Sequence, residues 1–99
     1  MKVVLAGKVM KIGETQEFGA NKTKKRVVRM DISTGGIASV VEINLMHDNA
    51  EKADQIKVGE EIEATGSLMG RLYTGADNVE KCFMEIQVYK IAKIGRVVL

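Results

Sequence analysis

The sequence holds few of the residue types that build catalytic or metal sites. It has one cysteine, Cys82, which excludes an internal disulfide and a multi-cysteine metal cluster. It has one histidine, His47, and the adjacent Asp48 is better explained as a helix cap than as a catalytic partner. A zinc site would need carboxylates as well, and no ligand spacing indicates one. The paired glycines at 35–36 have no helical pattern after them, so they predict a turn and not a phosphate loop. We therefore expect no enzyme, no cofactor and no metal.

Long apolar runs are scarce too. The N-terminal "KVVLA" is followed at once by Lys8 and Lys11, so it is neither the core of a signal peptide nor a membrane span. A single cysteine suits a reducing compartment. These features predict a cytoplasmic protein with no membrane partner.

The charge is nearly balanced. Fifteen basic and thirteen acidic residues give a formal net charge of +2, which is too small to indicate a nucleic-acid partner by itself. The distribution is uneven, however. Five cations and no acid fall between Asn21 and Met30, whereas acids predominate between Asp48 and Glu63. What the basic run indicates therefore depends on its place in the fold.

The 99 residues suit one domain, spanning 1–99, with 93–99 as a C-terminal extension. Hydrophobic alternation predicts five strands. They cover residues 2–12, 24–33, 39–46, 61–71 and 81–91, with polar loops at 13–23 and 72–80. Gly7 indicates a bulge or bend in the first strand. The side chains expected to face inward are Val28, Met30, Ile32, Val41, Ile43, Leu45, Ile62, Ala64, Gly66, Leu68, Gly70, Met84, Ile86 and Val88.

A short helix is expected between the third and fourth strands. Asp48 and Glu51 have the spacing of a capping box, and Gly59 marks the end of the segment. Ala50, Ala53 and Ile56 would cover one end of the sheet. Five strands with a helix at this point form the order of an OB-fold, an all-β five-stranded Greek-key barrel. An SH3-like barrel, the nearest competitor, does not usually carry a helix there.

Several motifs are typical of one protein family. The stretch "IKVGEEIEATGSLMGRLYTGADNVEKCFMEIQVYKI" resembles the second half of bacterial and phage single-stranded DNA-binding proteins. It has the Gly-acid turn after a helix, a strand with a central glycine, a Gly-Arg pair opening a hairpin loop, and an apolar-Glu-apolar-x-Val motif formed by Met84, Glu85, Ile86 and Val88. "AGKVMKIGE" resembles the opening strand of the family, and "INLMHDNAEKADQ" its entry into the helix. The similarity spans nearly the whole chain. It is nearest to the short relatives, such as primosomal replication protein B and small OB proteins of bacteria and phages.

The sequence also departs from that family. It has no tryptophan, whereas the family usually stacks bases on Trp and Phe. It has neither a glycine-rich linker nor an acidic C-terminal tip, and it ends in "GRVVL". The resemblance therefore implies the fold more strongly than the mode of action, since a fold alone does not fix a function.

The basic run lies where an OB-fold binds its ligands. OB-folds use the face of the second and third strands, flanked by the one-two and four-five loops. Cations there would neutralise phosphates, and exposed aromatic rings would stack bases. The candidate nucleic-acid-binding residues are Phe18, Lys22, Lys24, Lys25, Arg26, Arg29, Arg71, Tyr73 and Lys81.

Each candidate also has a structural explanation. Lysines on an exposed strand block edge pairing, and Arg29 can pair across strands with Glu42. Phe18 can fold back as a lid on the barrel. Phe83 and Tyr89 are expected on the outer side of the last strand, where covering a barrel flank or a subunit interface is favoured over stacking a base.

Two functions remain open. The first is largely sequence-independent binding of single-stranded nucleic acid, with DNA favoured over RNA by resemblance, in replication, recombination or repair. The second is a protein-interaction OB module, a non-enzymatic subunit of a replication or phage assembly. The apolar segment "RVVL" at 96–99 predicts in addition that the tail pairs with a strand and forms a homo-oligomer, a dimer or larger.

Overall fold

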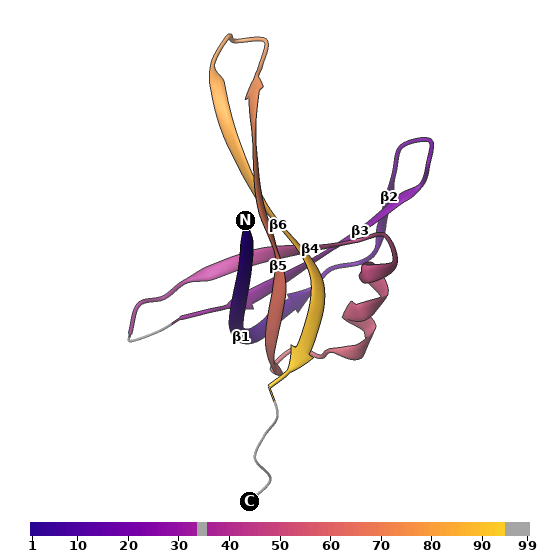
Figure 1. Ribbon diagram of the computed structural model, residues 1–99, viewed down its shortest axis with the longest axis vertical. Helices are drawn as coiled ribbons and strands as arrows, with labels where there is room; N and C mark the ends of the chain where they lie inside the picture. Colours follow the sequence, from indigo (N-terminus) through magenta and orange to yellow (C-terminus); the bar gives the residue numbers. More distant parts are fainter. Residues whose placement is uncertain (34–35, 95–99) are drawn as a thin grey trace, which may run out of the picture.

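A computed structural model describes residues 1–33 and 36–94 of the chain. Six strands form one sheet in the order β1-β5-β6-β4-β3-β2, and β1 also pairs with β3, so the sheet closes on itself (Figure 1). No helix in the described ranges is long and apolar enough to cross a membrane. The elements are β1 (Lys2–Ile12), β2 (Gln16–Phe18), β3 (Thr23–Asp31), β4 (Val40–Met46), the 3₁₀ helix η1 (His47–Gln55), β5 (Glu61–Thr74) and β6 (Glu80–Lys93).

Closure of the sheet depends on β1, which serves two partners. Its first part pairs antiparallel with β5 over Lys2–Lys8, and its last part pairs antiparallel with β3 over Lys8–Ile12, with a register shift between Val9 and Lys11. A Cβ at Gly7 would overlap the carbonyl oxygen of Asp31, so only glycine permits this approach. The far side closes where β4 and β6 pair in parallel. The expected OB-fold, with a helix after its third long strand, is confirmed.

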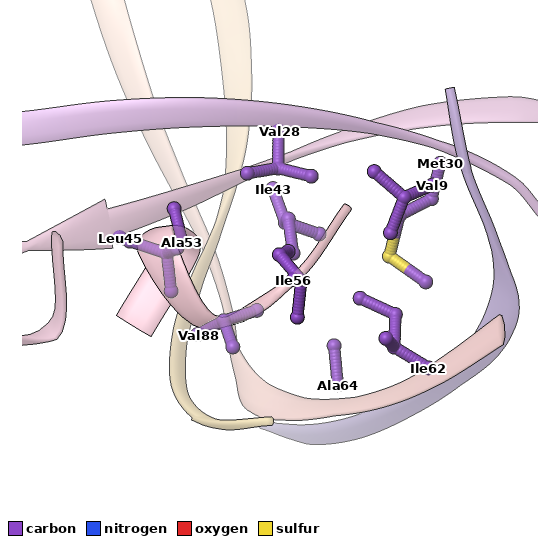
Figure 2. Packing of buried hydrophobic residues seen from close by; sticks show 10 residues of the cluster. All are labelled: Val9, Val28, Met30, Ile43, Leu45, Ala53, Ile56, Ile62, Ala64 and Val88. Atoms are coloured by element: carbon purple, nitrogen blue, oxygen red, sulfur yellow. The ribbon is translucent and has the colours of Figure 1, made fainter. Parts of the chain in front are cut away.

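The core fills this closed sheet. Val28 and Met30 on β3 and Ile43 and Leu45 on β4 are fully buried, as the alternation predicts. Ala53 of η1 and Ile56 just after it close one end of the barrel. Figure 2 shows the side chains converging from all five long strands and from η1. The cluster comprises Val9, Val28, Met30, Ile43, Leu45, Ala53, Ile56, Ile62, Ala64 and Val88.

Two segments expected to be loops contain strand residues. β2 lies inside the predicted loop 13–23 and forms a hairpin with β3. The predicted loop 72–80 is the tip of a long hairpin in which β5 and β6 stay paired out to Thr74 and Glu80. Both hairpins project from the barrel (Figure 1). Met84, expected to face inward, is therefore 76% exposed, and Gly70 is exposed as well, because no core lies beneath this part of the sheet.

The helix begins differently from the expected capping box. Met46 is the N-cap, no side chain caps the helix, and η1 is a 3₁₀ helix. His47 turns the chain from β4 into η1 with a φ of 54°, in the left-handed region. The capping role of Asp48 and Glu51 is thus wrong, because the tight turn leaves the first helical residue directly after the strand. Ala50, Ala53 and Ile56 are buried as expected. The tail at 95–99 lies outside the described residues.

Gly66 provides a test of how tightly β5 and β6 pack. A Cβ there would overlap the carbonyl oxygen of Gln87 and lie 2.8 Å from the Cα of Val88. Gly66→Ala is therefore expected to lower the free energy of unfolding by about 1–3 kcal/mol in urea denaturation, because the strands must separate to admit a methyl group. The matched control is Gly70→Ala in the same strand, where the nearest atom is 3.7 Å away. An equal loss in both variants would contradict close packing at Gly66.

Candidate nucleic-acid interface

The outward face of β3 and β4 carries a ladder of polar and basic side chains. Because Val28 and Met30 face the core, the alternate residues of β3 face outward. The register places Lys25 opposite Met46, Val27 opposite Asn44, and Arg29 opposite Glu42. Arg29 Nη2 lies 3.0 Å from Glu42 Oε2, so the predicted cross-strand pair is present. The cations on this face of the barrel therefore point toward solvent and are not needed to fill the core.

The β5–β6 hairpin carries two aromatic rings on one face, each opposite a cation. The register pairs Arg71 with Phe83 and Tyr73 with Lys81. Tyr73 and Phe83 are diagonal neighbours whose ring centroids lie 6.2 Å apart with an interplanar angle of 64°. The residues are 58% and 52% exposed. A π-face flanked by a cation is what a single-stranded nucleic acid uses for stacking and charge neutralisation.

A groove of about 250 Å³ joins these two faces. β3 contributes Lys25, β4 contributes Asn44, and the base of the hairpin supplies the other wall. Asn44 Nδ2 donates a hydrogen bond of 2.7 Å to Glu85 Oε1, which bridges β4 and β6. The groove thus crosses four strands, and its complete lining is Lys25, Asn44, Met69, Gly70, Arg71, Phe83, Met84 and Glu85.

A second hollow, of about 460 Å³, continues along β5 and β6 from Met69, which lines both. Tyr89 lies there at 46% exposure, next to the strained turn at His47. Tyr89 is thus an exposed ring at the far end of the same track.

The β2–β3 hairpin holds the remaining basic candidates. Lys24 lies opposite Glu17, and Lys22 occupies the turn with a φ of 51°. Phe18 ends β2 at 49% exposure, so it does not fold back to seal the barrel. Lys24 has the same parity as Arg26, so its side chain lies on the other face of β3 from Lys25, and the hairpin lies beyond the barrel, at a distance from the core.

Arg26, one of the predicted site residues, does not lie on the open face of β3 and β4. Its Nε donates to the carbonyl oxygen of Gly13 at 2.7 Å, and its Nη1 contacts Asp54 Oδ1 at 2.6 Å. Only 17% of its side chain is exposed. Arg26 has the same parity as Val28 and Met30, so it faces the barrel side and ties the loop before β2 to η1. Its guanidinium is committed to these partners, and we leave it out of the interface.

Comparison with known proteins identifies a family. Residues 4–92 match the family model described as "Domain of unknown function (DUF3127)". The chain belongs to this family. No curated protein matches it. Among solved structures, the fold is similar to the mitochondrial single-stranded DNA-binding protein Rim1 of S. cerevisiae, with a TM-score of 0.74 at 11% identity, covering 95% of this chain and 94% of that one. At this identity the likeness shows the OB-fold alone.

Four further residues of this DUF3127 chain line the candidate interface and were absent from the candidates named from the sequence. Asn44 was not a candidate and Glu85 appeared only in a strand motif, yet they meet beside the parallel pairing of β4 and β6. Phe83, for which covering a flank or a subunit interface was favoured over stacking a base, lines the groove. Lys11 lies opposite Arg29 in the β1–β3 pairing and lines a further hollow with it. The sequence placed Lys11 in the first strand but did not show that this part of the strand pairs with β3, so the proximity of Lys11 to Arg29 could not be predicted.

Other titratable groups lie away from the groove. The pKa of Asp31 is lowered because Ser33 hydrogen-bonds its carboxylate, with its backbone N–H donating at 2.8 Å, and the charge of Lys8 adds to the effect. Asp31 is at the opposite end of β3 from Lys25. No group of three or more His, Cys, Asp or Glu residues capable of holding a metal ion occurs in 1–33 and 36–94.

The position of Arg26 generates a stability prediction. Arg26→Ala removes a charge-assisted hydrogen bond to Gly13 and the contact with the exposed Asp54, and is expected to lower the free energy of unfolding by about 1–2 kcal/mol. Lys24→Ala, in the exposed hairpin, is the control and should stay within about 0.5 kcal/mol of the parent. Urea denaturation measures both. A stable Arg26→Ala variant would return Arg26 to the list of free cations.

Proposed function

We propose that this chain binds single-stranded nucleic acid, single-stranded DNA in particular, along the groove between β4 and the β5–β6 hairpin. The observation that carries the proposal is the pairing of exposed rings with cations, Phe83 opposite Arg71 and Tyr73 opposite Lys81, beside Lys25. Backbone phosphates need cations and unpaired bases need π-faces, and this surface supplies both at neighbouring positions. The OB-fold shared with Rim1 supports the same function.

Most of these contacts are insensitive to base sequence. Phosphate neutralisation and stacking use features that every nucleotide has. Among the described residues only strands line the groove, and no helix there could enter the major groove of a duplex, so we expect single strands to bind in preference to duplex. We propose a role in replication, recombination or repair, where exposed single strands of varied sequence occur.

Self-association is part of the proposal. In the described part of the chain, the first half of β1 pairs with β5 on one edge only, and Val4 on its outer face is 53% exposed. An open strand edge favours pairing with another chain. A second copy would lengthen a basic track that one small barrel supplies only in part.

A protein-interaction module is the second candidate. The face of the β5–β6 hairpin opposite the rings is apolar and exposed, with Leu72 at 66% and Met84 at 76%. Such a patch is typical of a protein contact. The two candidates differ in which face of the same hairpin matters, so variants on the two faces separate them.

Salt dependence tests the phosphate contacts. A fluorescent oligo-dT of about 16 nucleotides should bind more tightly than duplex of the same length, and affinity should fall with salt. If Lys25, Arg71 and Lys81 each neutralise one phosphate, the log–log slope is about −2. Lys25→Gln with Arg71→Gln should weaken binding and reduce the slope by about 1.4, whereas Lys57→Gln, beyond η1, should change neither. Equal affinity for duplex, or a flat salt response, would refute the proposal.

Ring removal tests the stacking contacts. Tyr73→Ala should weaken oligo-dT binding by about 1–3 kcal/mol with little change in the salt slope, because the ring carries no charge. The fold should be unaffected, since Tyr73 is 58% exposed. Leu72→Ala, on the opposite face of β5, is the matched control and should bind normally. If Leu72→Ala abolishes partner binding while Tyr73→Ala has no effect on DNA, the protein-interaction module is supported instead.

A further inference from the structure

The floor of the groove presents hydrogen-bond acceptors between its cationic walls. Glu85 is half-buried there, and its Oε1 accepts the 2.7 Å hydrogen bond from Asn44 Nδ2. An ionised carboxylate can only accept, so the Asn44 amide must turn its nitrogen toward Glu85. The Asn44 Oδ1 atom is then a second acceptor. A site that served phosphates alone would have donors at this point.

Within the described residues, Glu85 forms no ion pair. The ion pairs within 1–33 and 36–94 use the carboxylates of Asp54, Glu42 and Glu60. Lys25 and Arg71 line the same groove without forming an ion pair with Glu85. The negative charge of the Glu85 carboxylate therefore acts on a ligand in the groove, and it repels a phosphate placed on the floor.

This charge pattern orients a bound strand. The phosphates must follow Lys25 and Arg71, with Lys81 further out on the same face of the hairpin, and the bases must turn toward the floor. Phe83 lines the wall between them and offers a ring against which the base is held. The Watson–Crick edge of an unpaired base then meets the carboxylate of Glu85.

We propose that Glu85, held in place by Asn44, selects among bases at this position, favouring guanine and disfavouring thymine. The inference rests on the proposed binding of single-stranded DNA and adds a preference to it. Guanine presents N1–H and N2–H side by side, which match the two carboxylate oxygens in a bidentate contact. Adenine and cytosine present one amino group, and thymine presents one N3–H between two carbonyl oxygens that the carboxylate repels.

The expected discrimination is modest because one position carries it. A good bidentate contact gives roughly ten-fold preference for the right base. The rest of the strand is held by stacking and phosphates, which do not depend on the base. A guanine-containing strand should therefore bind about ten-fold more tightly than oligo-dT at the same salt.

The probes are oligonucleotides of about 16 nucleotides with isolated guanines spaced in a thymine background, which avoids stacked guanine quartets. A matched strand carries inosine in place of guanine and so lacks the N2 amino group, and a third is all thymine. The parent chain should bind in the order guanine, inosine, thymine. Glu85→Gln should bring the guanine-to-thymine ratio close to one, mainly by tightening thymine binding, because the repulsive charge is gone. Glu63→Gln, on an exposed position of β5 away from the groove, makes the same charge change and should keep the ratio.

The outcomes separate the two proposals. Binding of all three strands with equal affinity, or a ratio that Glu85→Gln leaves unchanged, overturns base selection and leaves the binding function standing. Absence of binding to every strand overturns the proposed function and the inference with it. Urea denaturation of Glu85→Gln accompanies the titration. If that variant is destabilised, Asn44→Ala supplies the second test, since it removes the hydrogen bond that holds Glu85 in place and should also reduce the guanine preference.

Discussion

The architecture depends on the double pairing of β1. A strand that leaves β5 and joins β3 must bend, and the bend brings its backbone against the carbonyl oxygen of Asp31, where only Gly7 fits. Without that approach the sheet would stay open, and its two halves would have no fixed relation. Closure fixes the curvature of β3 and β4 on one side and of β5 and β6 on the other. The cationic ladder and the paired rings face a common groove for this reason.

The groove combines opposite electrostatic tendencies. Its rim attracts a polyanion, and its floor repels one. These tendencies are compatible because a nucleic acid separates its charge from its bases by several ångströms. Arg26 lies on the barrel side of β3, where it fixes the loop before β2 against η1. Its charge is therefore not part of the candidate binding face.

The sequence predicts the parts of this fold that depend on burial. Val28 and Met30 alternate with outward residues because one face of β3 contacts the core, and the same argument locates Ile43 and Leu45. The two hairpins were missed in part because every residue of β2 is exposed, so no hydrophobic period marks it. Met84 follows the alternation of its strand but lies past the end of the core, and a sequence pattern does not show where a core stops.

The site was predictable only where it coincided with the basic run or the hairpin. Lys25, Arg71 and Tyr73 were found by that route, although their role in binding stays a prediction. Arg26 was named as a candidate because of its charge, although its position in β3 has the same parity as the buried Val28. Glu85 and Asn44 are 41 positions apart and meet through one backbone contact, so no local motif indicates their hydrogen bond. Pairs of this kind require the three-dimensional register.

The distribution of tyrosines has a spectroscopic consequence. The chain has no tryptophan and two tyrosines, and the two rings lie toward opposite ends of the same surface track, Tyr73 near the hairpin tip and Tyr89 beside the turn at His47. Tyrosine emission is therefore free of background from the core. Phenylalanine at either position leaves one ring to report on one end, so the intrinsic fluorescence of the protein can follow the direction in which the track fills.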